Sequence, residues 1–150
     1  MDALDPVLIA VHVVAVVLWI GAFAAIGVVA TGEGDVKVRG ALARRIYTKV
    51  AVPAFLGAVA FGLFRLLRGW SGTSVDANGI VAGGYAKAPW MHVKLTLALI
   101  IVALHHVIGG RTRKMATNGA PPGPIGVLSI VLVVAAAGAV GMVILRPFHH

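Results

Sequence analysis

The sequence predicts an all-α fold, a polytopic membrane bundle of four helices with both termini outside, and three observations carry this prediction. First, 59% of the 150 residues are hydrophobic and the mean hydropathy is +0.96. Second, only 12% of the residues are charged, about half the share found in a soluble domain. Third, four apolar segments have the length of ~20 residues that crosses ~30 Å of hydrocarbon, and basic residues are distributed unevenly between them.

Four spans are predicted in chain order. The first runs from about Pro6 to Ala30 and the second from about Val50 to Leu67. The third covers roughly Trp90 to Gly109, and the fourth runs from about Ile125 to Leu145. The 19 glycines fit this arrangement, because small residues let helices pack closely in lipid. Together the spans form one domain, residues 1–148.

The two ends of the chain need separate interpretation. Asp2 and Asp5, rather than basic residues, precede the first span, which is also longer than the apolar region of a signal peptide. We therefore expect this span to be a retained helix. His149 and His150 are interpreted as the remnant of an affinity tag.

The segments between the spans differ in charge. Residues 32–49 carry five basic side chains and residues 110–124 carry three, whereas residues 71–89 carry only Lys87. By the positive-inside rule the two basic loops are cytoplasmic and both termini lie outside, which suits the inner membrane of a bacterium. The net charge of +8 then needs no nucleic-acid partner, because basic loops set the topology and contact anionic lipid.

Arg65 and Arg68 depart from this charge pattern, because both lie at the outer end of the second span. One interpretation is that they are interfacial anchors beside Trp70, with long side chains that reach the membrane surface. The other is that they bind an anionic ligand such as the propionates of a haem, which suits the arginine fork.

The third span contains one lysine and three histidines: Lys94, His92, His105 and His106. Each such group in hydrocarbon costs roughly 2.5 kcal/mol or more unless it has a partner, water or a cofactor. At 100° per residue, His92 and His106 fall within about 40° of one face of the helix. Lys94 and His105 fall within about 20° of each other on a nearly opposite face.

His12 adds a histidine in the first span, at a depth similar to that of His92 from the outer boundary. Three interpretations remain open for this pair. They are axial ligands of a b-type haem between the first and third helices, they bind a metal such as copper, or they only form hydrogen bonds. The absence of cysteine excludes disulfides, iron–sulfur clusters and thiolate-ligated zinc.

Several motifs in this chain resemble the HemJ-type protoporphyrinogen oxidases, small membrane proteins of haem biosynthesis. The most specific is Trp90-x-His92-x-Lys94 followed by His105. The supporting features are His12 with Trp19 and Gly21, Arg44-Arg45-Ile46-Tyr47 with Pro53, Phe61 to Leu63, and Arg146-Pro147-Phe148.

The resemblance implies that the protein binds haem b and oxidises protoporphyrinogen IX, with electrons passing to a membrane acceptor such as quinone. His12, His92, Lys94 and His105 would be the functional polar groups, with Arg45 and Tyr47 in support. Lys94 would act as a base or hold a propionate, although it could also reach the outer interface. Besides porphyrin, the implied partners are the lipid bilayer and a second copy of the chain.

Two departures from the pattern leave the activity open. Residues 24–30 lack the arginine and histidine that usually follow the first helix motif, and residues 120–124 lack the usual Asn-Glu-x-Pro. There is also no glycine-rich dinucleotide fingerprint, since Gly32-x-Gly34 is a lone fragment. Whether the protein is an enzyme is therefore undecided at this point. A non-catalytic haem-binding electron carrier and a copper-handling membrane protein remain as alternatives.

Overall fold

The computed structural model describes residues 4–70, 74–76, 79–81 and 84–145. Its helices are α1 (Leu4–Thr31), α2 (Val36–Ile46), α3 (Val52–Gly69), α4 (Pro89–Asn118) and α5 (Ile125–Leu145). A π-helical segment, η1 (Tyr47–Ala51), joins α2 to α3. A short antiparallel hairpin, β1 (Ser74–Asp76) with β2 (Gly79–Val81), and a 3₁₀ turn, η2 (Tyr85–Lys87), connect α3 to α4.

Four of these helical segments are long and apolar enough to cross a membrane, which confirms the predicted all-α architecture. Their bounds are Pro6–Thr31, Val36–Gly69, Pro89–Asn118 and Ile125–Val143. We therefore describe the chain as an integral membrane protein in contact with a lipid bilayer. The predicted side of the membrane for each terminus stays a prediction.

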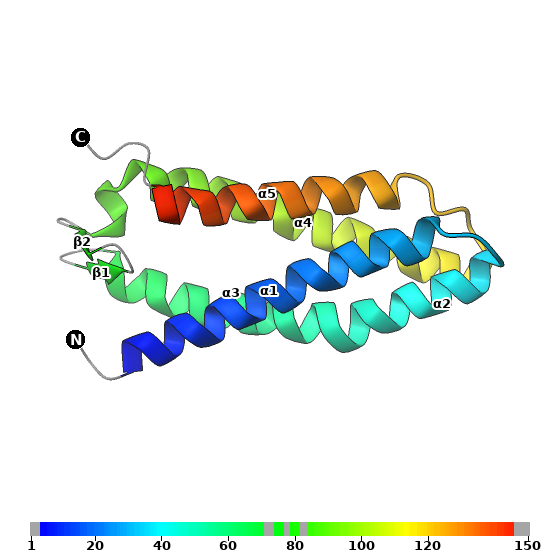
Figure 1. The fold of residues 1–150 in the computed structure, drawn as a ribbon, viewed down its shortest axis with the longest axis horizontal. Helices are drawn as coiled ribbons and strands as arrows, with labels where there is room; N and C mark the ends of the chain where they lie inside the picture. Colours follow the sequence, from blue (N-terminus) through cyan, green and yellow to red (C-terminus); the bar gives the residue numbers. More distant parts are fainter. Residues whose placement is uncertain (1–3, 71–73, 77–78, 82–83, 146–150) are drawn as a thin grey trace.

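The four segments form an elongated bundle (Figure 1). α1 packs against α3 and α5, and α4 packs against α5 and α2. The start of α1, the end of α5 and the β1–β2 hairpin lie at one end of the bundle, which we call the hairpin end (Figure 1). The α1–α2 turn and the α4–α5 connection lie at the other end, which we call the basic end. This arrangement places the two basic segments together, as their charge predicted.

Two predicted boundaries were wrong. The second helical segment begins at Val36 rather than near Val50, and α4 continues to Asn118 rather than ending near Gly109. The basic residues at 36–49 and 110–118 indicated loops, but packing between α2 and α4 stabilises both stretches as helix. Gly40 approaches α4 so closely that an added Cβ would lie 2.6 Å from the backbone nitrogen of Ala116.

α2 has its own start signal and its own buried face. The Asp35 side chain accepts a hydrogen bond from the backbone N–H of Val38, as an N-cap residue does. Gly40, Ala43 and Tyr47 follow at helical spacing and are buried, so the basic residues occupy the remaining faces. This amphipathic pattern, rather than mean hydropathy, identifies α2 as a helix.

The π-helical segment η1 sits directly before Pro53. Proline has no N–H, and its ring clashes with the carbonyl one turn earlier, so a regular α-helix cannot pass through this position unchanged. The backbone N–H of Val52 instead bonds to the carbonyl of Tyr47, five residues back. In Figure 1 the combined helix changes direction near this segment, as expected at a π-bulge beside proline.

Candidate functional site

His105 lies in the middle of α4 and is 1% exposed. It is surrounded by aromatic side chains from three helical segments, which we call the His105 cluster. The members of the cluster are Trp19, Phe23, Tyr47, Phe55 and His105. The closest ring contact is with Phe55, whose ring stacks on the imidazole with centroids 4.4 Å apart and an interplanar angle of 23°.

Both ring nitrogens of His105 have hydrogen-bond partners. Trp19 Nε1 donates to His105 Nδ1 at 3.0 Å. Because an indole N–H can only donate, Nδ1 must be unprotonated, and the neutral ring carries its hydrogen on Nε2. Nε2 therefore donates to the hydroxyl oxygen of Tyr47, also at 3.0 Å. In this arrangement His105 has no free lone pair for a metal, so it joins α1, η1 and α4 by hydrogen bonds.

Arg44, rather than the predicted Arg45, contacts this cluster. An Arg44 guanidinium nitrogen donates to the carbonyl of Gly109 at 3.1 Å. The guanidinium carbon of Arg44 lies over the Tyr47 ring, 5.1 Å from its centre. Arg45 is exposed on the outer surface of α2. Gly109 leaves the space that the phenol occupies, since a Cβ there would lie 2.3 Å from the Tyr47 hydroxyl oxygen.

His12 has a different environment on α1, nearer the hairpin end. Its Nδ1 lies 2.8 Å from the backbone carbonyl of Ala58 on α3 and donates to it, because a carbonyl can only accept. In the neutral ring Nε2 then carries a lone pair, and no residue that the structure describes bonds to it. Gly62 makes room for this ring, since a Cβ there would lie 2.8 Å from His12 Cε1.

Two cations from other helices lie near this imidazole. The His12 ring is within electrostatic range of Lys94 on α4 and of Arg65 on α3. Lys94 and Arg65 are also within electrostatic range of each other, where their like charges repel. We call His12, Lys94 and Arg65 the His12 site, which joins α1, α3 and α4 near the hairpin end.

Among the other predicted site residues, His92 lies near the start of α4. His92 is exposed, its Nε2 bonds to the carbonyl of Ala86 at 3.0 Å, and its ring lies 6.3 Å from Trp70. Since Ala86 belongs to η2, His92 is tied to the connection before α4. The predicted pairing of His92 with His12 around one haem stays a prediction.

Each of three further predicted site residues contacts an aromatic ring: Arg68, His106 and Trp90. Arg68 is exposed, with its guanidinium carbon 5.7 Å from the centre of the Phe64 ring. His106 is exposed beside the His105 cluster, and the centroids of the His105 and His106 rings are 5.2 Å apart. Trp90 is 2% exposed and meets Tyr85 edge to face. None of these contacts brings the three residues into the His12 site.

The faces predicted for α4 agree with the structure. Lys94 is half-buried and His105 is buried, whereas His92 and His106 are exposed. Helical periodicity therefore paired these residues correctly by face, and burial in the structure shows that Lys94 and His105 occupy the inward face.

Sequence reasoning missed Phe23, Phe55 and Arg44 as neighbours of His105. One available signal was the spacing of small residues in the second span. Ala51, Ala54 and Ala58 follow Tyr47 at steps of three and four residues, and all three are buried. This stripe marks the face of η1 and α3 that packs on α1.

Comparisons with protein families, with curated proteins and with solved structures find no match.

Proposed function

We propose that the protein is a membrane porphyrin-binding protein that holds a b-type haem at the His12 site. We further propose that it oxidises protoporphyrinogen IX to protoporphyrin IX, as its motifs suggest. The observation that carries the binding proposal is the Nε2 of His12, which has no hydrogen-bond partner among the described residues and lies within electrostatic range of two cations.

The donor set fits one axial ligand of a haem. The Ala58 carbonyl fixes both the tautomer and the orientation of the His12 ring, as second-shell partners of metal-binding histidines do. A bound haem would accept and release single electrons. His92 remains the proposed second ligand, through Nδ1, because its Nε2 already bonds to Ala86.

Lys94 and Arg65 fit the carboxylates of a porphyrin. The four membrane-spanning segments contain no aspartate or glutamate. The half-buried ammonium of Lys94 therefore has no carboxylate within these segments to neutralise it. A propionate entering the site would supply that charge, and a guanidinium nearby could bind a second one in bidentate fashion.

The same side chains would serve the oxidation. Removing hydrogen from a porphyrinogen releases electrons and protons, so the site needs groups that take up protons. Since both nitrogens of His12 would be engaged, by Ala58 and by the haem, Lys94 is the group that would take up a proton, in its neutral amine form, and the ammonium so formed is the one that a propionate would neutralise. In this proposal the electrons leave for a membrane acceptor such as quinone. The His105 cluster acts as the structural support, because it holds α1, η1 and α4 in register.

An optical spectrum of the purified protein, as isolated and after haem addition, tests the binding proposal. We expect a Soret band and a sharp α-band on reduction, and both should be lost in His12→Ala. A wild-type protein that binds no haem when haem is added would reject the proposal. Oxidase activity is tested separately by complementation of a bacterial strain that lacks its own protoporphyrinogen oxidase.

The two alternatives predict other outcomes. A haem-binding electron carrier would give the same spectrum but would not complement the strain. A copper-handling protein would bind copper without haem. Among the described residues no three His, Cys, Asp or Glu side chains cluster, so copper would need a smaller set of these ligands.

A further inference from the structure

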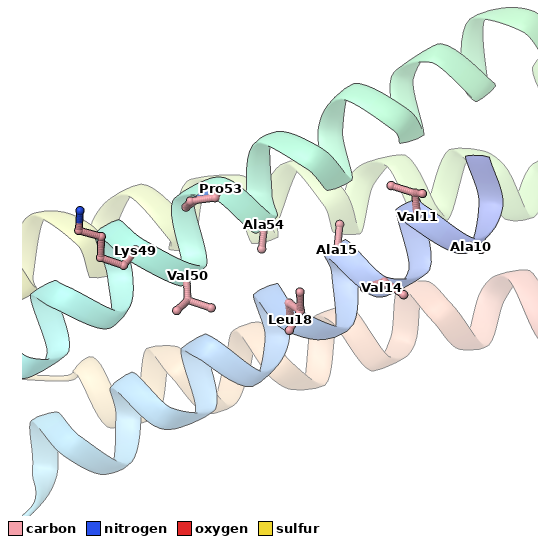
Figure 2. Close-up of a pocket in the computed structure, with 9 residues that line it drawn as sticks. All are labelled: Ala10, Val11, Val14, Ala15, Leu18, Lys49, Val50, Pro53 and Ala54. Carbon is pink, nitrogen blue, oxygen red and sulfur yellow. The ribbon is translucent and has the colours of Figure 1, made fainter. Parts of the chain in front are cut away.

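An apolar groove runs along the surface of the bundle between α1 and the η1–α3 segment (Figure 2). It has a volume of about 520 Å³, within the range of small-molecule sites. Buried Ala15 and Ala54 lie where the two helices approach each other. Its edges are formed by bulkier residues that are also exposed, among them Val14, Leu18 and Val50.

The groove has a cationic end. Lys49 lines it at the end nearest α2 (Figure 2). Arg45 lies four residues earlier, one turn away on the same side of the helix, and both side chains are exposed. Like charges at this spacing repel each other, and the whole segment from Val36 to Gly69 contains no acidic residue. An anion at this end would relieve the repulsion.

Lys49 also marks a boundary between polar and apolar sequence. The next charged residue along the helix is Arg65, sixteen residues later, which is about 24 Å at the helical rise of 1.5 Å per residue. This length is close to that of the hydrocarbon core. On this face of the bundle, the headgroup region therefore begins at Lys49, and the groove extends from there into the hydrocarbon.

We propose that the groove binds one acyl chain of an anionic phospholipid, whose phosphate is held by Arg45 and Lys49. The combination of two cations and a continuous apolar channel matches a phosphate joined to a hydrocarbon chain. A second copy of this chain fits less well, because two copies meeting at this face would bring their Arg45 and Lys49 residues together.

Phosphatidylglycerol and phosphatidylcholine provide the test, because they have the same acyl chains and differ in net charge. Binding to the purified full-length protein is measured by native mass spectrometry and by the shift in thermal unfolding. We expect phosphatidylglycerol to bind more tightly than phosphatidylcholine. Arg45→Gln with Lys49→Gln should remove this preference, at roughly fivefold in affinity for each cation.

Two matched controls separate the groove from general effects. Arg113→Gln with Lys114→Gln removes the same charge from exposed positions on α4 and should leave the preference intact. Val14→Trp should obstruct the groove and weaken binding, whereas Val13→Trp, at an exposed position that does not line it, should not. The proposal would be overturned if both charge variants lost the preference for phosphatidylglycerol equally. It would also be overturned if the two tryptophan variants bound phosphatidylglycerol equally well.

Discussion

The two inward-facing histidine environments differ in one decisive respect. His105 has both ring nitrogens occupied by neighbouring side chains, whereas His12 has one nitrogen bonded to the Ala58 carbonyl and the other without a partner in the described part of the chain. The first is enclosed by aromatic rings, and the second lies beside two cations. The hydrogen-bond partners of a buried histidine therefore decide whether a ring nitrogen is left available to a ligand.

The sharpest test of this difference is the loss of haem in two single variants. His12→Ala should lower haem affinity by roughly a hundredfold or more, because even second-shell changes cost 10–100-fold. His105→Phe should keep most of the haem per folded protein, since its ring nitrogens are already occupied. The measurement is the Soret absorbance relative to protein concentration. The opposite ranking would transfer the ligand role to His105.

Gly109→Val should have the largest effect on stability. A side chain at this position collides with the Tyr47 hydroxyl, so the bond from His105 to Tyr47 cannot persist. We expect the free energy of unfolding to fall by about 2–4 kcal/mol, from overpacking and one lost interhelical bond. Gly110→Val is the matched control, because nothing lies within 4 Å of a Cβ there. Equal melting temperatures for the two variants would contradict the packing argument.

Removing the His105 hydrogen bonds should have a smaller effect. His105→Phe preserves the ring but leaves the Trp19 N–H and the Tyr47 hydroxyl without this partner, at a cost of about 1–3 kcal/mol. Adding Trp19→Phe should cost less in this background than in the wild type. A double-mutant cycle by thermal unfolding measures that coupling, and additive effects would mean that the Trp19 bond contributes nothing.

A more subtle change probes the space around His12. Gly62→Ala places a methyl group 2.8 Å from the ring and should tilt it, which weakens haem binding by roughly tenfold. Gly57→Ala is the control, since its Cβ would meet only Ala15 at the ordinary distance of 3.5 Å. Both variants should remain folded. Unchanged haem affinity in Gly62→Ala would show that the orientation of the ring is not required.

The last prediction concerns the side of the membrane that the His12 site faces. Ser74→Cys in the hairpin and Thr117→Cys at the basic end should be labelled by an impermeant reagent from opposite sides, with Ser74→Cys labelled from outside. Neither cysteine variant should change haem binding, so these two substitutions have the smallest expected functional effect. Labelling of Thr117→Cys from outside would place the His12 site near the cytoplasmic surface.

The sequence by itself determined that the chain is a four-helix membrane protein and which polar residues of α4 share a face. Hydropathy and helical periodicity depend only on residue type and spacing, so Lys94 and His105 could be separated from His92 and His106 in advance. The clustering of basic segments at one end also followed from charge.

Only the tertiary structure decided how far the helices extend and what each histidine contacts. α2 has an N-cap and an amphipathic pattern in its sequence, but its buried face packs closely on α4 at Gly40, an influence that local charge does not encode. The roles of His12 and His105 depend on Ala58, Trp19 and Tyr47, which are 46, 86 and 58 residues away in sequence. Helix packing determines which of these distant residues become hydrogen-bond partners. Residue type and local spacing therefore could not reveal which imidazole keeps a nitrogen without a partner among the described residues.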